Sequence, residues 1–228
     1  THTKGHINAG YAGAIKNLAM GCVSSSHRDQ GWKKGRGGMH CHGELSLQWN
    51  PELCTFCEQC KNICPLHSIE FKEGAFTYDE PHCWHCGRCS RVCQEGALTM
   101  PQDDETFQKS MAEAAAAVLS TFKKGKVVYI NFLFQIQPEC DCMPVADVPV
   151  IQDQGIMISD DLVAIEQATL DMLRAAPPLP QSAAEEAQIR PGDDILFKIN
   201  PRPMQLQVDE AERLGLGTKK YELVRIEP

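Results

Sequence analysis

Apolar positions recur at helical spacing in four stretches of the chain, and each stretch has residues suited to begin or end a helix. The clearest apolar stripe runs through residues 103–124 and predicts a helix that packs on a sheet. That stripe consists of Phe107, Met111, Ala115, Val118 and Phe122. The predicted helices cover residues 8–21, 103–124, 160–176 and 204–214, with Asn8 and Ser159 as N-caps of the first and third, and Gly21 and Gly215 as stops of the first and last.

Three other stretches have the pattern of β-strands. Residues 126–136, KVVYINFLFQI, are apolar on both faces and rich in β-branched and aromatic side chains, which is typical of an interior strand of a parallel sheet. Residues 155–159 and 221–227 complete the set. Strands and helices alternate here, so the predicted fold class is α/β, with a parallel or mixed sheet and flanking helices.

Residues 54–93 contain an internal repeat. The spacing C-x2-C-x2-C-x3-C occurs twice, and each cysteine of the first array recurs 29 residues later. Two short strands about Glu73 and Gly74 are predicted between the arrays, and ALTM follows the second array at the offset at which SIEF follows the first. The repeat predicts an inserted α+β module of the bacterial-type two-cluster ferredoxin kind. It departs from that pattern at Gln94, where Pro65 would recur.

The doubled spacing is typical of [4Fe-4S] ligation, in which three cysteines of one run hold a cluster and the fourth reaches the other cluster. Zinc sites use paired knuckles and four ligands, which leaves the third cysteine of each array unexplained. A disulfide framework belongs to small secreted chains, and 228 residues do not require one. We therefore assign one cluster to Cys54, Cys57, Cys60 and Cys93, and the other to Cys83, Cys86, Cys89 and Cys64.

The formal net charge of −8 omits the clusters, whose thiolates make the chain more negative. This charge argues against nucleic acid as a partner and suits an electron carrier that docks on a basic patch of a redox partner protein. No apolar run approaches the roughly 18 residues of a membrane span, and no signal peptide is present. Twelve cysteines without a secretion signal favour a reducing cytoplasm and an anaerobic metabolism.

Several motifs together resemble one protein family. The segments KGH, GAIKNLAMGC, CDC, DLVAIEQA and AERLGLG, with the double cluster motif between them, are similar to the DUF362 iron-sulfur proteins, whose activity is uncharacterised. The resemblance implies a ferredoxin module, residues 46–101, inserted in an α/β domain formed by residues 1–45 and 102–228. The family usually has a further α/β segment before KGH, so we expect a homo-oligomer or a complex with another chain.

Four cysteines lie outside the cluster arrays: Cys22, Cys41, Cys140 and Cys142. On an extended backbone Cys140 and Cys142 present both sulfurs to one side, and they follow a predicted strand, where open α/β sheets place ligand sites. With Cys22, and with His40 or Cys41 as a fourth ligand, they form a candidate site for a metal ion or a further iron-sulfur cluster. The alternative is that these cysteines are small buried hydrophobic residues.

Lys4, His6 and Lys16 belong to the segments that resemble the family, and they are candidate substrate-binding or proton-handling groups; the alternative is a structural or solvated role. Dinucleotide, phosphate-loop and Ser-His-Asp signatures are absent, so any enzyme would be an oxidoreductase or metal-based. Our functional hypothesis is a redox protein whose two [4Fe-4S] clusters relay electrons to a metal or substrate site near the CDC segment. The alternative is a plain electron-transfer subunit of a larger complex; a regulatory sensor lacks any DNA-binding signal.

Overall fold

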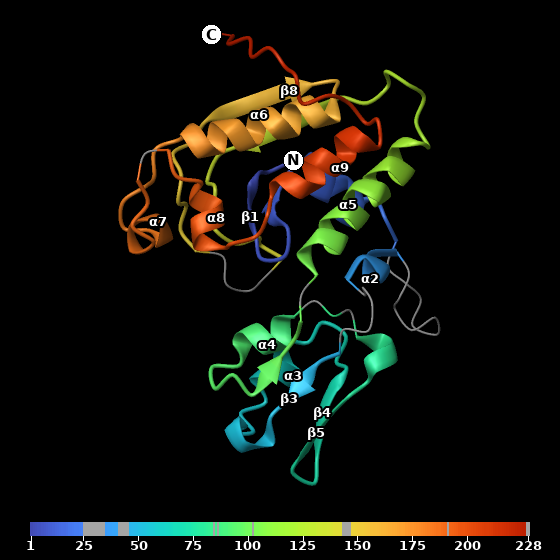
Figure 1. Ribbon diagram of the computed structural model, residues 1–228, viewed down its shortest axis with the longest axis vertical. Helices are drawn as coiled ribbons and strands as arrows, with labels where there is room; N and C mark the ends of the chain where they lie inside the picture. Colours follow the sequence, from blue (N-terminus) through green and yellow to red (C-terminus); the bar gives the residue numbers. More distant parts are fainter. Residues whose placement is uncertain are drawn as a thin grey trace. The chain divides into compact units, whose positions relative to one another are not determined.

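The computed structural model describes residues 1–24, 35–40, 46–83, 85, 87–101, 103–142, 147–190 and 192–226. The chain divides into two compact units (Figure 1). Unit 1 comprises Thr1–Val23 and Asp104–Pro228, and unit 2 comprises Ser24–Asp103. Residues 24–45, which the sequence analysis assigns to the first part of the α/β domain, are thus grouped with the cysteine arrays.

Unit 2 repeats its secondary structure at the 29-residue offset of its cysteines. Its described residues also include the short helix α2 (Gly35–His40) before the repeat. The repeated elements are the 3-10 helices η2 (Pro51–Leu53) and η3 (Glu80–His82), and the helices α3 (Gln59–Ile63) and α4 (Arg88–Val92). Even the left-handed backbone positions recur in pairs, at Phe56 and His85, Glu58 and Gly87, and His67 and Gly96. The sequence repeat is therefore a repeat of backbone conformation.

Two antiparallel strand pairs complete unit 2. The hairpin of β4 (Ile69–Lys72) and β5 (Ala75–Tyr78) turns at Glu73 and Gly74, as predicted, and pairs Phe71 with Phe76. The second pair joins β3 (Gln48–Trp49) to β6 (Leu98–Thr99). A small core beneath these strands includes Leu47, Cys60, Ile69, Cys89, Leu98 and Met100.

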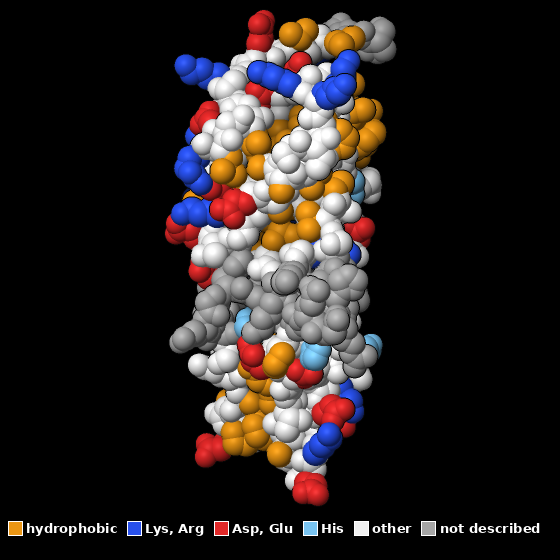
Figure 2. Space-filling view, turned by 90° about the vertical axis from the view of Figure 1, so that its right-hand side faces the viewer, with side chains coloured by type: hydrophobic (Ala, Val, Ile, Leu, Met, Phe, Trp, Pro, Cys, Tyr) orange, Lys and Arg blue, Asp and Glu red, His pale blue; other side chains and the backbone are white. Residues whose placement is uncertain are grey.

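The centre of unit 1 is the pair β7 (Tyr129–Leu133) and β8 (Gly155–Ser159), which is antiparallel and is covered on one face by α6 (Leu162–Ala175). The prediction of an interior parallel strand over residues 126–136 differs from this arrangement. On the opposite face Ile130 pairs with Ile158 and Phe132 with Ile156, and all four side chains are exposed. Figure 2 shows apolar side chains that reach the surface. Apolar residues on both faces of a strand therefore do not mean that both faces are covered.

The N-terminal hairpin of β1 (Lys4–His6) and β2 (Gly10–Ala12) leads into α1 (Ala14–Gly21). This helix starts later than the predicted Asn8, because residues 10–12 pair with β1 instead of joining the helix. It packs against α5 (Asp104–Leu119), which also contacts α9 (Gln205–Arg213). The prediction that residues 103–124 pack on a sheet is therefore wrong, since their buried stripe meets other helices.

Three further predictions about unit 1 differ in detail. Asp161, not Ser159, caps α6, because its side chain accepts the Ala164 amide at 2.9 Å. Residues 221–226, expected to be a strand, have no regular secondary structure. The described part of unit 1 also contains the short helices α7 (Ala183–Glu186) and α8 (Ile195–Ile199). No helix among the described residues is both long and apolar enough to cross a bilayer.

Candidate redox sites

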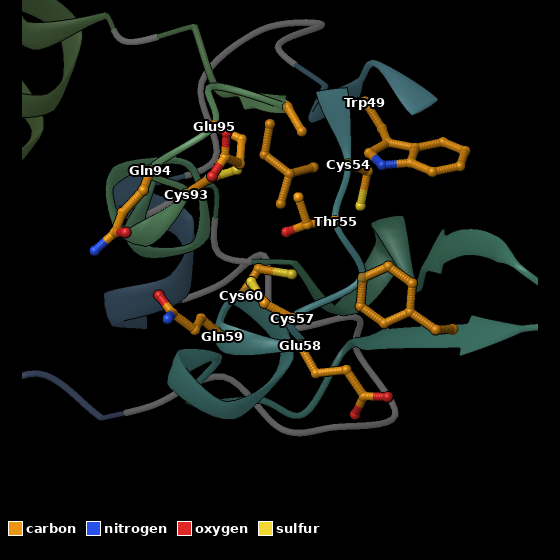
Figure 3. Close-up of a pocket in the computed structure, with 13 residues that line it drawn as sticks. Trp49, Cys54, Thr55, Cys57, Glu58, Gln59, Cys60, Cys93, Gln94 and Glu95 are labelled. Carbon is orange, nitrogen blue, oxygen red and sulfur yellow. The ribbon is translucent and has the colours of Figure 1, made fainter. Parts of the chain in front are cut away.

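The first candidate site is a cavity in unit 2 lined by four cysteines from two distant parts of the sequence (Figure 3). Cys54, Cys57 and Cys60 come from the first array, and Cys93 comes from the end of the second. The left-handed conformation at Glu58 starts α3 one residue later, so the loop turns back and its cysteines surround one space. Burial raises the pKa of Cys60. The donor set is the four-thiolate set that the sequence analysis assigns to one cluster.

The second cavity repeats the first with the two arrays exchanged. Cys83 and Cys89 line it together with Cys64, which comes from the end of the first array; Cys86 lies outside the described residues. Backbone amides donate to two of these sulfurs at 3.4 Å, from Ser68 to Cys64 and from His85 to Cys83. Such donors stabilise thiolates, which is the form in which cysteines bind a cluster.

Aromatic side chains line both cavities, and the charged residues beside the two cavities differ. Trp49 lines the first cavity and stacks on Phe76 with ring centroids 5.7 Å apart. Its equivalent 29 residues later, Tyr78, lines the second cavity. Glu58 and Glu95 lie at the first cavity, whereas Arg88 lies at the second. The repeated backbone conformation thus carries different charges at the two cavities.

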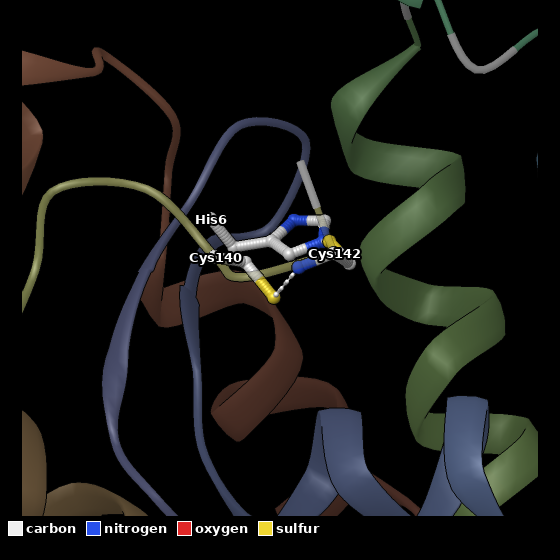
Figure 4. Close-up of side chains that lie close together, drawn as sticks. All are labelled: His6, Cys140 and Cys142. Carbon is white, nitrogen blue, oxygen red and sulfur yellow. Dashed lines mark hydrogen bonds between the residues drawn. The ribbon is translucent and has the colours of Figure 1, made fainter. Parts of the chain in front are cut away.

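A third candidate site lies in unit 1, around the CDC segment (Figure 4). Ligand atoms of His6, Cys140 and Cys142 all lie within 4.8 Å of one another. Strand β1 brings His6 there, because the Gly5 amide donates to the Gln137 carbonyl at 2.8 Å. Only glycine allows this approach, since a Cβ at Gly5 would lie 1.8 Å from the Pro138 carbonyl oxygen.

All three predicted substrate or proton-handling residues contact this segment. Lys4 Nζ lies 2.5 Å from Asp141 Oδ1, His6 Nε2 lies 3.7 Å from Cys142 Sγ, and Lys16 Nζ lies 3.7 Å from Cys140 Sγ. These contacts join residues more than 120 positions apart in the sequence, so spacing alone does not predict them. The hypotheses about Lys4, His6, Lys16 and the CDC segment therefore concern one site.

Hydrogen bonds and nearby ammonium groups favour anionic forms of the CDC segment. A hydrogen bond from the Cys142 side chain lowers the pKa of Cys140 to about 6; burial opposes this shift, and the Lys16 ammonium adds to it. The hydrogen bond from Lys4 lowers the pKa of Asp141. Cys140 is buried, at 2% exposure, while Cys142 is exposed. The pair therefore combines an anionic inner sulfur with an accessible outer one.

The other predicted ligands are not among these three clustered residues. Cys22 is the exposed C-cap residue of α1 and is not one of the three clustered residues. His40 ends α2 in unit 2, and Cys41 lies outside the described residues. Within unit 1, the described residue whose ligand atom lies beside the CDC pair is His6, and the sequence analysis does not include it among the metal ligands.

The sequence analysis does not single out Glu166, which is fully buried on α6. Its carboxylate accepts hydrogen bonds from the Tyr11 hydroxyl, the Ala14 and Ile15 amides and the Asn131 side chain. An acidic residue directly after the apolar run LVAI of this helix is the signal that would have identified it.

Two cavities lined by cysteine arrays of crossed origin, in a two-fold repeated α+β unit, define a ferredoxin-like module. The family model "Domain of unknown function (DUF362)" matches residues 1–171. The chain therefore belongs to the DUF362 family, and the resemblance found in the sequence is confirmed.

Named relatives match shorter stretches. The chain is 38% identical over 67 residues to an uncharacterised ferredoxin of Methanocaldococcus jannaschii. The matched stretch covers 28% of this chain and 39% of that protein. It is 31% identical over 58 residues to Ferredoxin-1 of Rhodobacter capsulatus, 25% of this chain and 77% of that protein. It is 28% identical over 90 residues to Hydrogenase-4 component A of Escherichia coli, 36% of this chain and 40% of that protein.

Proposed function

We propose that this chain is an iron-sulfur electron-transfer protein that holds two [4Fe-4S] clusters in unit 2. One cluster would be bound by Cys54, Cys57, Cys60 and Cys93, and the other by Cys83, Cys86, Cys89 and Cys64. The observation that carries the proposal is the crossed lining of the two cavities, in which the last cysteine of each array joins the first cysteines of the other. The ferredoxin names of the relatives support it.

When bound, such clusters accept and donate single electrons. The residues of unit 2 provide the conditions for this chemistry. Amides of Ser68 and His85 donate to sulfurs, and Trp49 and Phe71 supply apolar surface at the first cavity, which limits access of water. These groups would stabilise thiolate ligands and set the potentials of the two sites.

We further propose that the electrons serve a metal or substrate site on unit 1, around His6, Cys140 and Cys142. The convergence of Lys4, His6 and Lys16 on the CDC segment supports this proposal. A plain electron carrier has no need of such a site. We infer that unit 1 is an α/β domain, on the support of α6 over the β7–β8 pair and a parallel bridge between His2 and Phe132.

The partner in this proposal is a redox protein, in a homo-oligomer or a complex with another chain. The similarity to a protein named as a hydrogenase component supports a role within an assembly. The same similarity favours the alternative function, a plain electron-transfer subunit with no site of its own.

Anaerobic iron and acid-labile sulfide analysis tests the cluster assignment. We expect about eight iron and eight sulfide per chain from unit 2. Replacement of Cys57 by Ser should remove about half of both, whereas Cys22→Ser, at an exposed cysteine outside the arrays, should leave them unchanged. A zinc-dominated preparation without sulfide would refute the proposal.

A further inference from the structure

The hydrogen bonds of His6 determine where its ring carries a proton. Nδ1 accepts the backbone amides of Asn8 at 3.2 Å and Ala9 at 3.1 Å, in the turn of the β1–β2 hairpin. An amide N–H can only donate, so Nδ1 bears no proton, and neutral imidazole carries its proton on Nε2. Rotating the ring by 180° would direct a C–H at these amides, which fixes its orientation.

The proton on Nε2 faces Cys142. Nε2 lies 3.7 Å from Cys142 Sγ, so the ring donates a hydrogen bond to that sulfur. A metal ion at Nε2 would displace this proton and leave both ring nitrogens deprotonated, whereas metal-ligating histidines usually keep a proton on the other nitrogen and donate it to an acceptor. The geometry of His6 therefore suits a proton donor to sulfur better than a metal ligand.

Cys140 is positioned as the second member of a thiol pair. The Cys142 amide donates to Cys140 Sγ at 3.4 Å, which curls the segment and brings the two sulfurs within 4.8 Å of each other. Lys16 Nζ lies 3.7 Å from Cys140 Sγ. The inner sulfur thus has the Lys16 ammonium and an amide as partners, and as a thiol it donates to Asp141 Oδ1 at 3.5 Å. The outer sulfur has the imidazole N–H.

We propose that Cys140 and Cys142 form a reversible dithiol–disulfide couple that exchanges with a substrate disulfide, with His6 as hydrogen-bond donor to Cys142 and Lys16 as counter-ion of Cys140. This couple rests on the proposed function, because it specifies the chemistry of the unit 1 site proposed there. It requires no metal at that site.

The exchange balances without another reactant. The exchange starts from the reduced pair with one proton, in the form that has the thiol at Cys140, donating to Asp141 Oδ1, and the thiolate at Cys142, stabilised by His6 Nε2–H. Cys142 attacks one sulfur of the substrate disulfide RSSR, forms a mixed disulfide and releases RS⁻. Cys140 then attacks Cys142, the internal S–S bond forms, and the second half leaves with the proton as RSH. Two electrons pass from the protein to the substrate.

Mass spectrometry of one tryptic peptide tests the couple in the full chain. Cleavage after Lys126 and Arg174 releases residues 127–174, whose only cysteines are Cys140 and Cys142. The anaerobic, cluster-loaded protein is equilibrated in dithiothreitol or glutathione buffers of graded potential, quenched in acid and alkylated. We expect this peptide to change reversibly between a doubly alkylated form and an internal disulfide, with glutathione disulfide as the substrate probe.

Matched variants separate the chemical role of His6 from its structural role. An asparagine oxygen can replace Nδ1 as acceptor for the turn amides but offers nothing at Nε2, so His6→Asn should slow reaction with glutathione disulfide about tenfold. Glutamine places an N–H near the position of Nε2, so His6→Gln should react faster than His6→Asn. Lys16→Met should shift the equilibrium about tenfold toward the disulfide, because it destabilises the thiolate, and Lys16→Arg should restore it.

Two results would overturn the inference. One is a peptide that stays dithiol in every buffer. The other is a peptide that resists alkylation until a chelator releases stoichiometric metal, which would establish a metal site instead. Iron, sulfide and EPR signals recorded on the same samples distinguish the two proposals: intact clusters with an inert CDC pair refute only the couple, and an active couple without clusters refutes only the iron-sulfur function.

Discussion

The backbone amide of Ala14 donates a 2.7 Å hydrogen bond to Oε1 of Glu166, so a side chain of α6 caps the first turn of α1. The Ile15 amide donates to Oε2 of the same carboxylate at 3.2 Å. Side-chain acceptors of this kind satisfy amides that the helix leaves without partners. Because α1 also carries Lys16 to Cys140, this buried carboxylate orients the helix that contributes to the unit 1 site.

Glu166→Gln should destabilise unit 1, and the effect should depend on pH. Glutamine places an NH2 group where one carboxylate oxygen accepts a hydrogen bond. A buried N–H donor then faces another donor and loses its acceptor, at a cost of about 1–3 kcal/mol. Burial raises the pKa of Glu166 above its ordinary value of 4.5, against its hydrogen bonds. Because the pKa of Glu166 is higher in the folded state, its neutral carboxyl stabilises the fold. The difference in free energy of unfolding between the parent protein and the variant should therefore decrease as pH rises through the raised pKa. Thermal unfolding at pH 5 and pH 8 would measure it; a gap that widens with pH would mean that the four donors outweigh burial.

Gly5→Ala should disrupt the contact between β1 and the segment before Cys140. The new Cβ would meet the Pro138 carbonyl oxygen, so the two backbones must separate, at a cost on the order of 2–4 kcal/mol. The matched control is Gly21→Ala. Its Cβ would lie at an ordinary contact distance of 3.8 Å from Asn17 Oδ1, so this substitution should stabilise α1 by up to about 1 kcal/mol. Melting curves by circular dichroism compare them. Equal melting temperatures would contradict the close approach.

Trp49 and Tyr78 should each protect the cluster in the cavity that they line against bleaching in air. In a Cys57→Ser background, only the site of Cys64, Cys83, Cys86 and Cys89 is expected to retain iron. There Tyr78→Ala should speed bleaching of the visible absorbance in air, because Tyr78 lines that cavity, while Trp49→Ala should have little effect, because Trp49 lines the other. A larger effect of Trp49→Ala would contradict the crossed assignment.

The charges beside the cavities should separate two reduction potentials. An added electron is less favourable near Glu58 and Glu95 than near Arg88. Glu95→Gln should raise the lower potential, and Arg88→Gln should lower the higher one, each by tens of millivolts because solvent screens exposed charges. EPR-monitored redox titration distinguishes the two signals. Shifts of one and the same signal in both variants would be incompatible with this assignment.

The sequence predicted local features well where one residue type determines them. The hairpin at Glu73 and Gly74 and the end of α9 near Gly215, which has a positive φ of 74°, are where the turn residues indicated. The C-terminal end of α5 was less predictable than these turns. The hydroxyls of Ser120 and Thr121 donate to carbonyls three residues earlier, and such bonds compete with helix continuation.

Contacts between distant residues could not be predicted from local pattern. Nothing in the motif KGH indicates that His6 meets Cys142, because that contact depends on the pairing of β1 with residue 137. Likewise, the apolar residues of β7 do not reveal which face α6 covers. In the sequence, Glu166 is one polar residue of a predicted helix. Only the folded structure shows that its carboxylate accepts the first amides of α1.

The crossed origin of the cysteines has a consequence for how the module can be divided. In the proposed assignment, each half supplies three sulfurs to one cluster and one sulfur to the other. Among the described cysteines, Cys64 and Cys93 each line the cavity of the other half. A half cut at the hairpin of β4 and β5 would hold an incomplete ligand set and one surplus thiol. It could become complete only by associating with a second half, so the smallest autonomous form of this architecture is a pair, whether fused in one polypeptide or assembled from two.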